Sequence, residues 1–201
     1  GLASIGEGMS FALLDVSTGK EIRRFIGHTD LIQSFAFAND ARRLLTGSRD
    51  MTARYWDADT GRELRRFEGY KDRVNRVAIS PNGKLGAIAG GNYNSPKGPA
   101  DSSIRLWNLE SGEEIWRANE DGKSYIVQLQ FTPDGRFLLS SGIFSLDSPS
   151  DPSLKVWNTA TGKLVASHQV LLMLVAVAVS PDSRFIAAAD MMGSVALWTV
   201  P

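Results

Sequence analysis

Three side chains that could form a catalytic triad lie within residues 27–68. His28, Thr46 and Asp50 supply an imidazole, a hydroxyl and a carboxylate, the three kinds of group that a nucleophilic triad needs. The sharp turn that presents such a nucleophile in one large enzyme class has the pattern G-x-S-x-G, which is absent from the sequence. We therefore expect these groups to be paired for structural reasons, as buried polar groups normally are.

Other site chemistry has little support in the sequence. The chain has two histidines, His28 and His168, and no cysteine, which excludes disulfides and thiolate metal sites. Asp147 and Asp151 with nearby serines could ligate calcium, but their spacing matches no calcium-binding loop. We expect no catalytic residue, no metal site and no cofactor.

Composition narrows the kinds of partner. Acidic and basic residues number 22 each, so net charge provides no general attraction to nucleic acid or an anionic membrane. The arginines between residues 23 and 76 are interleaved with acids, which favours a solvated edge over a phosphate-binding track. The apolar run 170–179 is about half the length needed to span a bilayer. We expect no nucleic-acid partner, no membrane insertion and, from the absence of cysteine and of a visible signal peptide, a cytoplasmic protein.

The elements that must position these residues repeat along the chain. Equivalent positions at the end of a short apolar run are spaced by 42, 51, 50 and 41 residues, and they are Leu14, Trp56, Trp107, Trp157 and Trp198. A period near 42 residues, lengthened where loops carry insertions, indicates a repeat architecture.

Each repeat has the same order of strand and turn signals. Turns such as Pro81-Asn82-Gly83 and Thr161-Gly162-Lys163 consist of residues that favour or tolerate a tight bend, and no segment has the periodicity of a useful amphipathic helix. The sequence predicts four-stranded antiparallel units, with first strands over 31–38, 74–80, 125–132 and 172–180, second strands over 43–48, 85–90, 137–142 and 185–190, and a fourth strand such as 63–67.

Sheets this small must stack on one another. One such sheet is only marginally stable alone, and the alternation of Phe and Ala over 35–38 suits interdigitation with a neighbouring sheet. The predicted fourth strands carry charges that suit an exposed edge, namely Arg23, Arg24, Arg65 and Arg66.

With these features the chain resembles WD40-repeat β-propellers. The matching elements are Gly27-His28, Trp56-Asp57, the Trp-Asn pairs at 107–108 and 157–158, and the Ser/Thr-Gly turns; the turns are similar to those of bacterial members. The resemblance covers essentially all 201 residues. It implies an all-β propeller domain with about five registers of four-stranded sheets, divided into units 1–26, 27–68, 69–118, 119–167 and 168–201.

The resemblance also implies a hydrogen-bonded network in each complete repeat. In the unit 27–68 its members are His28, Thr46, Asp50 and Trp56, and the imidazole needs the carboxylate to set its tautomer. The other units depart from the pattern: Tyr70 replaces the His, Gly8 and Met192 replace the Asp, and Leu14 replaces the Trp. The members that these units keep are Asp101, Trp107, Ser140, Asp151, Trp157 and Trp198. His168 is two residues from the expected place, so we interpret it as a loop or strand-edge residue.

Two adjacent units carry long insertions on one face. Ser48 and Trp56 are 8 residues apart, whereas the equivalent intervals ending at Trp107 and Trp157 are 17 and 15. Long loops on a rigid scaffold commonly carry binding; tolerated surface insertion is the alternative. We expect a protein-binding site across these loops that comprises Arg49, Tyr70, Asn92, Tyr93, Asn94, Lys97, Ile143, Phe144, Leu146 and Asp147.

Each of the two terminal units lacks the sequence signal for one strand. The sequence starts within a second strand near residues 2–5 and stops after a third strand, so we expect the first unit to lack its innermost strand and the last its outermost. Because seven blades are typical of the family, we expect part of a larger propeller. A closed five-unit ring and assembly with another chain are the alternatives.

The functional expectation follows from the resemblance. It favours a non-enzymatic scaffold that recruits protein partners through loops on one face. The alternatives are a structural subunit or segment of a larger assembly, and a ligand-binding or enzymatic propeller with a central-channel site. Few catalytic candidates are available for the last of these.

Overall fold

Five antiparallel sheets follow one another along the chain. The computed structural model describes residues 2–91, 101–119, 124–144, 153–169 and 174–201. Sheet 1 contains β1 (Leu2–Glu7), β2 (Ser10–Asp15) and β3 (Glu21–Ile26); sheet 2 contains β4 (Ile32–Phe37), β5 (Arg43–Ser48), β6 (Ala53–Asp57) and β7 (Glu63–Phe67); sheet 3 contains β8 (Val74–Ile79), β9 (Leu85–Gly90), β10 (Ser103–Asn108) and β11 (Glu114–Asn119). Sheet 4 contains β12 (Ser124–Phe131), β13 (Phe137–Phe144), β14 (Ser153–Asn158) and β15 (Leu164–Gln169), and sheet 5 contains β16 (Leu174–Val179), β17 (Phe185–Asp190) and β18 (Val195–Thr199).

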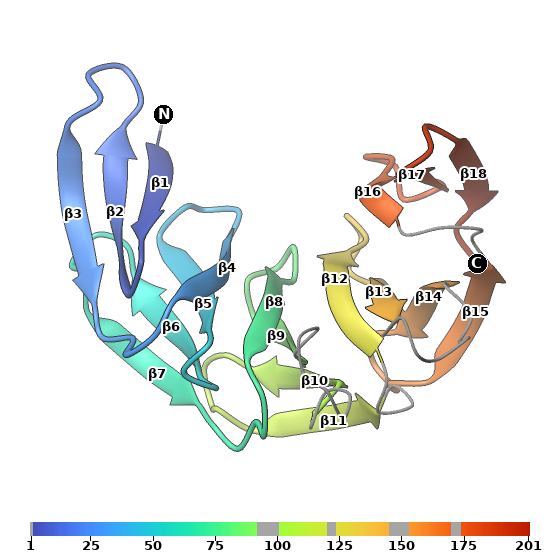
Figure 1. Ribbon diagram of the computed structural model, residues 1–201, viewed down its shortest axis with the longest axis horizontal. Coiled ribbons are helices and arrows are strands. Elements are labelled where there is room, and N and C mark those ends of the chain that lie inside the picture. Colours follow the sequence, from blue (N-terminus) through green and yellow to red (C-terminus); the bar gives the residue numbers. More distant parts are fainter. Residues whose placement is uncertain (1, 92–100, 120–123, 145–152, 170–173) are drawn as a thin grey trace.

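The sheets are arranged around an open arc with strand order increasing outward. In sheets 2, 3 and 4 the first strands β4, β8 and β12 lie toward the inside, and β7, β11 and β15 lie on the outside (Figure 1). Sheets 1 and 5 stand at the two ends of the arc (Figure 1). The all-β propeller-type architecture predicted from sequence is confirmed, and the part of the chain that the structure describes has three strands in each end sheet.

The second insertion differs in part from the prediction. Ile143 and Phe144, which we expected in a loop, belong to β13, where they pair with Tyr125 and Ser124. The insertion therefore lengthens the hairpin between β12 and β13 as well as the connection that follows it. Sequence alone does not show whether residues that follow a predicted strand extend the strand or begin a loop. Pairing with a neighbouring strand decides between the two.

A β-bulge recurs at the tryptophan position. In sheets 1 to 4 the pairing register between the last two strands shifts at the same step. The shifts lie at Leu13/Leu14, Tyr55/Trp56, Leu106/Trp107 and Val156/Trp157. A bulge adds one unpaired residue and redirects the side chain beside it. The bulge thus places the equivalent side chain in the same relation to its sheet in each repeat.

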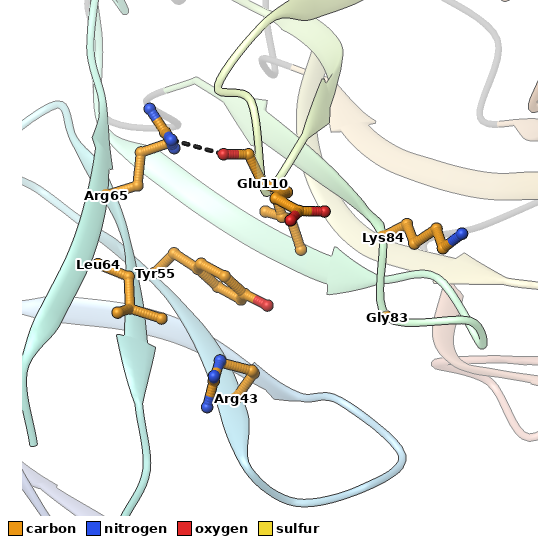
Figure 2. Close-up of a pocket in the computed structure, with 8 residues that line it drawn as sticks. Arg43, Tyr55, Leu64, Arg65, Gly83, Lys84 and Glu110 are labelled. Atoms are coloured by element: carbon orange, nitrogen blue, oxygen red, sulfur yellow. Dashed lines mark hydrogen bonds between the residues drawn. The ribbon is translucent and has the colours of Figure 1, made fainter. Parts of the chain in front are cut away.

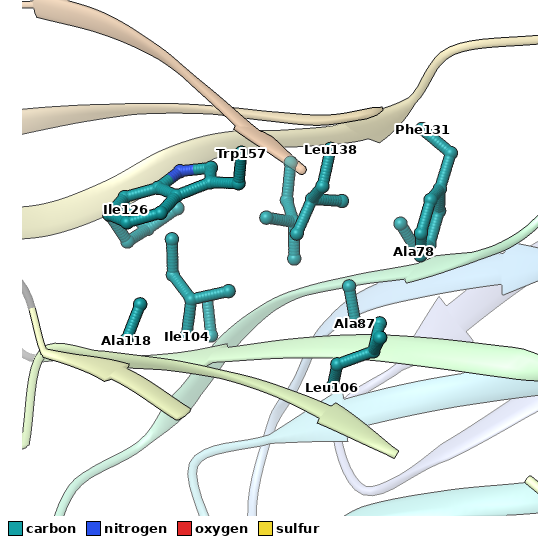
Figure 3. Close-up of a cluster of buried hydrophobic side chains, with 11 residues drawn as sticks. Ala78, Ala87, Ile104, Leu106, Ala118, Ile126, Phe131, Leu138 and Trp157 are labelled. Atoms are coloured by element: carbon teal, nitrogen blue, oxygen red, sulfur yellow. The ribbon is translucent and has the colours of Figure 1, made fainter. Parts of the chain in front are cut away.

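Four apolar clusters lie between successive sheets and form the core. Between sheets 3 and 4, the small side chains Ala78 and Ala87 lie opposite the large side chains Phe131 and Leu138 (Figure 3). Small groups opposite large ones let the two sheets approach at the packing density of a protein interior. Because each cluster is shared by two sheets, the sheets stabilise one another in series.

The recurring Ser/Thr-Gly turns also hold neighbouring sheets together. A side chain of the outer strand of one sheet covers the turn glycine of the next sheet in three cases, which are Arg23 on Gly61, Arg65 on Gly112 and Trp116 on Gly162. The Trp116 indole additionally donates a hydrogen bond of 2.7 Å to the Thr159 carbonyl. Arg23 and Arg65 are therefore inter-sheet contacts in addition to the edge charges that we predicted.

Substituting Gly162 with Ala is expected to destabilise the protein more than the same change at Gly19. Both glycines have left-handed backbones, with φ of 69° and 68°, which costs alanine about 1–2 kcal/mol. A Cβ at Gly162 would lie 2.8 Å from the Trp116 ring, whereas a Cβ at Gly19 would meet nothing within 4 Å. In urea denaturation, Gly162→Ala should lower the free energy of unfolding by at least about 1 kcal/mol more than Gly19→Ala does. Equal decreases for the two variants would contradict the inter-sheet role of Gly162.

Candidate interaction sites

The four side chains expected to form a network in sheet 2 are hydrogen-bonded in series. The Trp56 indole nitrogen lies 2.9 Å from Thr46 Oγ1, which lies 2.8 Å from His28 Nε2. His28 Nδ1 lies 2.8 Å from Asp50 Oδ2. The series links β5 and β6 to the segment that enters sheet 2 from sheet 1, so it connects two sheets.

The direction of these bonds follows from what each group can donate. The Trp56 indole can only donate, so the Thr46 oxygen accepts its hydrogen. With the Asp50 carboxylate accepting from Nδ1 of a neutral imidazole, Nε2 of His28 accepts the Thr46 hydroxyl hydrogen. Every polar hydrogen in the series is then used, and this explains how an imidazole is buried here without cost from an unpaired group.

Asp50 is held in its charged form. Burial by itself raises its pKa, but hydrogen bonds from His28, the Thr52 hydroxyl and the Thr29 amide outweigh burial and place the pKa well below its usual range. Its side chain is 4 % exposed, and an Arg54 guanidinium nitrogen lies 3.8 Å away. The site is therefore a buried, ionised structural centre whose imidazole and hydroxyl hydrogens are already engaged.

Sheet 3 has a corresponding network around its tryptophan, but it is built from different residues. Tyr70 occupies the His28 position, and its hydroxyl accepts a hydrogen bond of 2.9 Å from the Trp107 indole. The Arg105 guanidinium lies 4.0 Å above the Tyr70 ring and forms an ion pair of 2.5 Å with Asp101. Burial raises the pKa of Tyr70. Tyr70 was predicted to belong to the partner-binding set, and the structure shows that it is buried within this network.

The sequence reading missed a buried arginine in both networks. Arg54 and Arg105 stand two residues before the tryptophan of their sheets and are 4 % and 3 % exposed. Arg54 pairs with Glu63 at 2.6 Å, and Arg105 lies 4.0 Å from the equivalent Glu114. The signal that could have identified them is the repeated Arg-x-Trp pattern followed by a Glu at a fixed distance.

The prediction that the arginines between 23 and 76 line a solvated edge is therefore wrong for two of them. Arg54 lies on a third strand, where acidic side chains cover its charge. Arg76 lies on the inner strand β8, and its Nε donates a hydrogen bond of 2.6 Å to the Val127 carbonyl in sheet 4. Strand position within the sheet, rather than residue type, decides whether these charges reach solvent.

Sheets 4 and 5 retain progressively less of the network. In sheet 4 the Trp157 indole donates to Ser140 Oγ at 2.8 Å. In sheet 5 the position equivalent to Thr46 is Ala188, and the Trp198 ring instead stacks on the His168 ring with centroids 5.1 Å apart. His168 lies in β15, the outer strand of sheet 4, which agrees with its interpretation as a strand-edge residue.

Most of the predicted partner-binding residues are outside the described part of the chain. Arg49 follows β5 and is half-buried, and its Nε has no hydrogen-bond partner in the described structure. Ile143 and Phe144 are strand residues, as noted above. The remainder of the predicted set, which is Asn92, Tyr93, Asn94, Lys97, Leu146 and Asp147, lies outside the described residues, as does Asp151.

A polar hollow lies between sheets 2 and 3 at the strand ends opposite the long connections. Its volume is about 390 Å³, and its lining includes Tyr55, Arg43, Arg65, Lys84 and Glu110 (Figure 2). A second hollow of about 250 Å³ shares Arg43, Tyr55 and the turn at Gly83 with it. The two hollows therefore adjoin each other at this edge of the interface between the two sheets.

The inner strands form a further hollow that bears on the central-channel alternative. It has a volume of about 480 Å³ and is lined from β4, β8 and β12 by apolar side chains with the amides of Asn39 and Gln130. No ionisable side chain belongs to this described lining, so it offers no group for acid–base chemistry.

The described residues contain neither a metal-binding cluster of side chains nor a membrane-spanning helix. No group of three or more His, Cys, Asp or Glu side chains there could hold a metal ion. In the same residues no helix is long and apolar enough to cross a membrane.

Comparison with known proteins gives relatives that differ widely in size. The chain is 27% identical over 190 residues to apoptotic protease-activating factor 1 of Homo sapiens, covering 89% of this chain and 14% of that protein. It is 34% identical over 126 residues to transducin beta-like protein 2 of Homo sapiens, covering 58% of this chain and 26% of that protein. It is 24% identical over 177 residues to the U3 small nucleolar RNA-associated protein 15 homolog of Xenopus tropicalis, covering 87% of this chain and 30% of that protein.

The chain thus spans a minor part of each of these relatives. All three are eukaryotic proteins, so they give no support to the expectation of bacterial-style repeats. The family model for the WD domain, G-beta repeat, matches residues 19–57, 61–108 and 116–158. These matches cover more than half of the sequence, and each runs from the outer strand of one sheet through the third strand of the next. The chain therefore belongs to the WD40-repeat family.

Proposed function

We propose that this chain is a non-enzymatic scaffold that recruits protein partners at one edge of sheets 3 and 4. The observation that carries the proposal is the length of two neighbouring connections. The second and third strands are joined through residues 91–102 in sheet 3 and 145–152 in sheet 4, but through residues 49–52 in sheet 2. Extended connections anchored on a rigid scaffold are the usual carriers of binding.

The strands that hold these connections support the proposal. Sheets 3 and 4 share an apolar cluster that includes the fully buried Ile104 and Leu138, so the ends of both connections are held in a fixed relation. Arg49 lies at the same edge in sheet 2 and is partly exposed. WD40 repeats generally mediate protein interactions, which agrees with a protein partner. We place the protein in the cytoplasm on the absence of cysteine alone.

Removing both connections is expected to abolish partner capture without unfolding the sheets. The deletion should cover 92–100 and 145–150, because residue 144 belongs to β13. Affinity capture from a lysate of the source cells, followed by mass spectrometry, gives the readout, and urea denaturation checks the fold. In a matched control, Gly-Ser linkers of the same lengths replace the two segments. Capture that survives in the linker variant would show that the connections act only as spacers and would contradict the proposal.

A second candidate function rests on the outward face of sheet 5. In sheet 3 the face covered by sheet 4 consists of Ala78, Ala87, Ala89, Ile104 and Leu106, and the equivalent residues of sheet 5 in the same pairing register are Ala178, Ala187, Ala189, Val195 and Leu197. Ile104 and Leu106 are 0% exposed, whereas Val195 and Leu197 are 73% and 66% exposed. We propose that a further sheet of the same kind, from a longer polypeptide or another molecule, covers this face.

Introducing charge on this face is expected to suppress association. Sedimentation velocity should show concentration-dependent association for the wild-type chain, because contiguous exposed apolar surface promotes it. The variant with Val195→Asp and Leu197→Asp should remain monomeric. Val165→Asp is the control, since Val165 is an exposed apolar residue on the outer strand β15. A wild-type chain that is monomeric at all concentrations would count against the proposal.

A further inference from the structure

The polar hollow between sheets 2 and 3 has features that the fold does not require. It lies where β5 begins and where the turns after β8 and β10 meet β7 (Figure 2). Its volume of about 390 Å³ falls in the range of about 300–1,000 Å³ that small-ligand pockets occupy. It is at the opposite strand ends from the long connections, so it is separate from the partner site proposed above.

Comparison of the sheets shows that the Tyr55 phenol is specific to this interface. The residues equivalent to Tyr55 in sheets 1, 3 and 4 are Leu13, Leu106 and Val156, and each of them is a buried core residue. At the position of Arg65, sheet 1 has Arg23 and sheet 3 has Trp116, and each of these side chains packs on the next sheet. Equivalent packing at the Tyr55 position is thus achieved elsewhere with apolar groups, so the packing does not require the Tyr55 hydroxyl. Arg65 also packs on the turn at Gly112, and what it adds to the hollow is its unengaged N–H groups.

Arg43 follows the same pattern. The residues that open the second strands of sheets 3 and 4 are Leu85 and Phe137, and both belong to or pack against apolar clusters. In sheet 2, Arg43 donates hydrogen bonds of 2.7 Å to Asp57 and 2.9 Å to the Arg42 carbonyl. The positive charge of Arg43 is therefore already paired with Asp57. Arg43 lines the hollow but is not the main group that would attract a negatively charged ligand.

The hollow presents donors that remain available. The Tyr55 hydroxyl has no hydrogen-bond partner in the part of the chain that the structure describes, although the side chain as a whole is buried. Arg65 uses one nitrogen on the Glu110 carbonyl, at 2.5 Å, and its other N–H groups are not engaged there (Figure 2). Burial raises the pKa of Tyr55, so the hydroxyl keeps its hydrogen and acts as a donor at neutral pH.

The remaining lining restricts the ligand further. Leu64 and Leu109 supply an apolar surface beside the donors, and the exposed Lys84 adds a second positive charge. The Glu110 side chain adds one negative charge, which together with the nearby Asp57 repels a doubly charged phosphate more strongly than a singly charged carboxylate. The arrangement fits one carboxylate with an aliphatic group next to it.

We propose that this hollow binds a carboxylate adjacent to an aliphatic group, such as a Leu-Glu pair in a peptide or a free branched aliphatic acid. The carboxylate accepts hydrogen bonds from the Tyr55 hydroxyl and the Arg65 guanidinium, and the aliphatic group contacts Leu64 and Leu109. Hydrogen bonds between a guanidinium and a carboxylate are among the stronger ones in proteins, and the aliphatic contact adds affinity in proportion to the area buried.

Titration by two-dimensional NMR with three probes tests the site. N-acetyl-Leu-Glu-amide is expected to bind saturably in the millimolar range, with shifts centred on Tyr55 and Arg65. N-acetyl-Leu-Gln-amide, which has the same shape without the charge, should bind at least about tenfold more weakly. The third probe is 4-methylpentanoate: affinity equal to that of the Glu peptide identifies a free acid as sufficient, and weaker affinity identifies the peptide as the better ligand.

Variants distinguish the site from general charge attraction. Tyr55→Phe keeps the ring and should weaken binding of the Glu peptide about fivefold, and Arg65→Met should weaken it at least about tenfold. Arg66→Met is the matched control, because Arg66 is the next residue of β7, is exposed, and does not line the hollow; its affinity should equal that of the wild type. The same spectra report whether each variant is folded.

Three results would overturn the proposal. They are the absence of saturable shifts with the Glu peptide, equal affinity for the Glu and Gln peptides, and equal losses in Arg65→Met and Arg66→Met. Tyr55→Phe keeps the proposal testable if Arg65→Met does not fold, because the Tyr55 hydroxyl contributes no hydrogen bond to the described structure.

Discussion

The Asp50→Ala variant is expected to lose about 3 kcal/mol in the free energy of unfolding. The change leaves the buried His28 without the acceptor 2.8 Å from its Nδ1, and it removes the carboxylate 3.8 Å from the buried Arg54. It also removes acceptors for the Thr52 hydroxyl and the Thr29 amide. Breaking a buried pair by removing one member is costly because the other member stays buried and uncompensated. Urea denaturation at neutral pH provides the measurement.

Asp59→Ala is the matched control for this prediction. Asp59 lies in an exposed turn of the same sheet, and its replacement should change stability by less than about 0.5 kcal/mol. Partner capture by Asp50→Ala at a temperature where it stays folded should match that of the wild type. A loss of capture without a loss of stability would mean that Asp50 belongs to a binding site and not to a structural network.

The role of Asp50 also predicts a pH dependence. Its folded-state pKa is lowered, so its contribution to stability is fully present above the unfolded pKa of about 4 and is lost as the pH falls through the folded-state pKa. The stability difference between the wild type and Asp50→Asn should be constant above about pH 5 and should shrink at lower pH. A difference that does not change down to about pH 2 would contradict a charged Asp50.

Trp157→Ala is expected to cost about 4 kcal/mol, the largest loss predicted for a single substitution here. The side chain belongs to the cluster between sheets 3 and 4 and contacts a surface that includes Ile104 and Leu138 (Figure 3). Its removal opens a cavity between two sheets and leaves Ser140, itself buried, without the indole donor at 2.8 Å. Both effects lower the free energy of unfolding measured in urea, and loss of the Trp157 fluorescence is the accompanying signal.

The equivalent substitution in sheet 5 provides the comparison. Trp198 is half-buried and stacks on His168 at the end of the arc, so Trp198→Ala should cost about 2 kcal/mol. The difference between the two variants measures the contribution of packing between two complete sheets. Equal losses would show that position in the arc does not affect the stability contributed by the tryptophan.

Local sequence was sufficient to predict the strands and their order. The second strands were predicted at the observed bounds in sheets 2, 3 and 5, namely over Arg43–Ser48, Leu85–Gly90 and Phe185–Asp190. The turns between strands use Gly, Asn and Asp at positions whose backbone conformation these residues adopt easily. Such signals act between residues close in sequence, so they can be read without a structure.

Pairing and burial could not be predicted in the same way. Tyr70 was expected in a protein-binding site, yet it is buried and accepts a hydrogen bond from Trp107, which is 37 residues away. Arg54 was expected in solvent, yet it is enclosed between Asp50 and Glu63. These environments are created by strands that are distant in sequence. The local pattern of charged residues does not predict which side chains will surround a given position.

The sequence by itself determined that this protein is a series of small stacked antiparallel sheets, because strand periodicity, turn chemistry and repeat spacing are local properties. The network of His28, Thr46, Asp50 and Trp56 was implied by the resemblance to WD40 repeats. Only the tertiary structure decided that His28 and Tyr70 hold equivalent tryptophans by different chemistry. It also placed Tyr55 and Arg65 in a hollow between two sheets. The physical reason is that exposure, hydrogen bonding and cavity shape depend on contacts between sheets, which exist only after the sheets have packed.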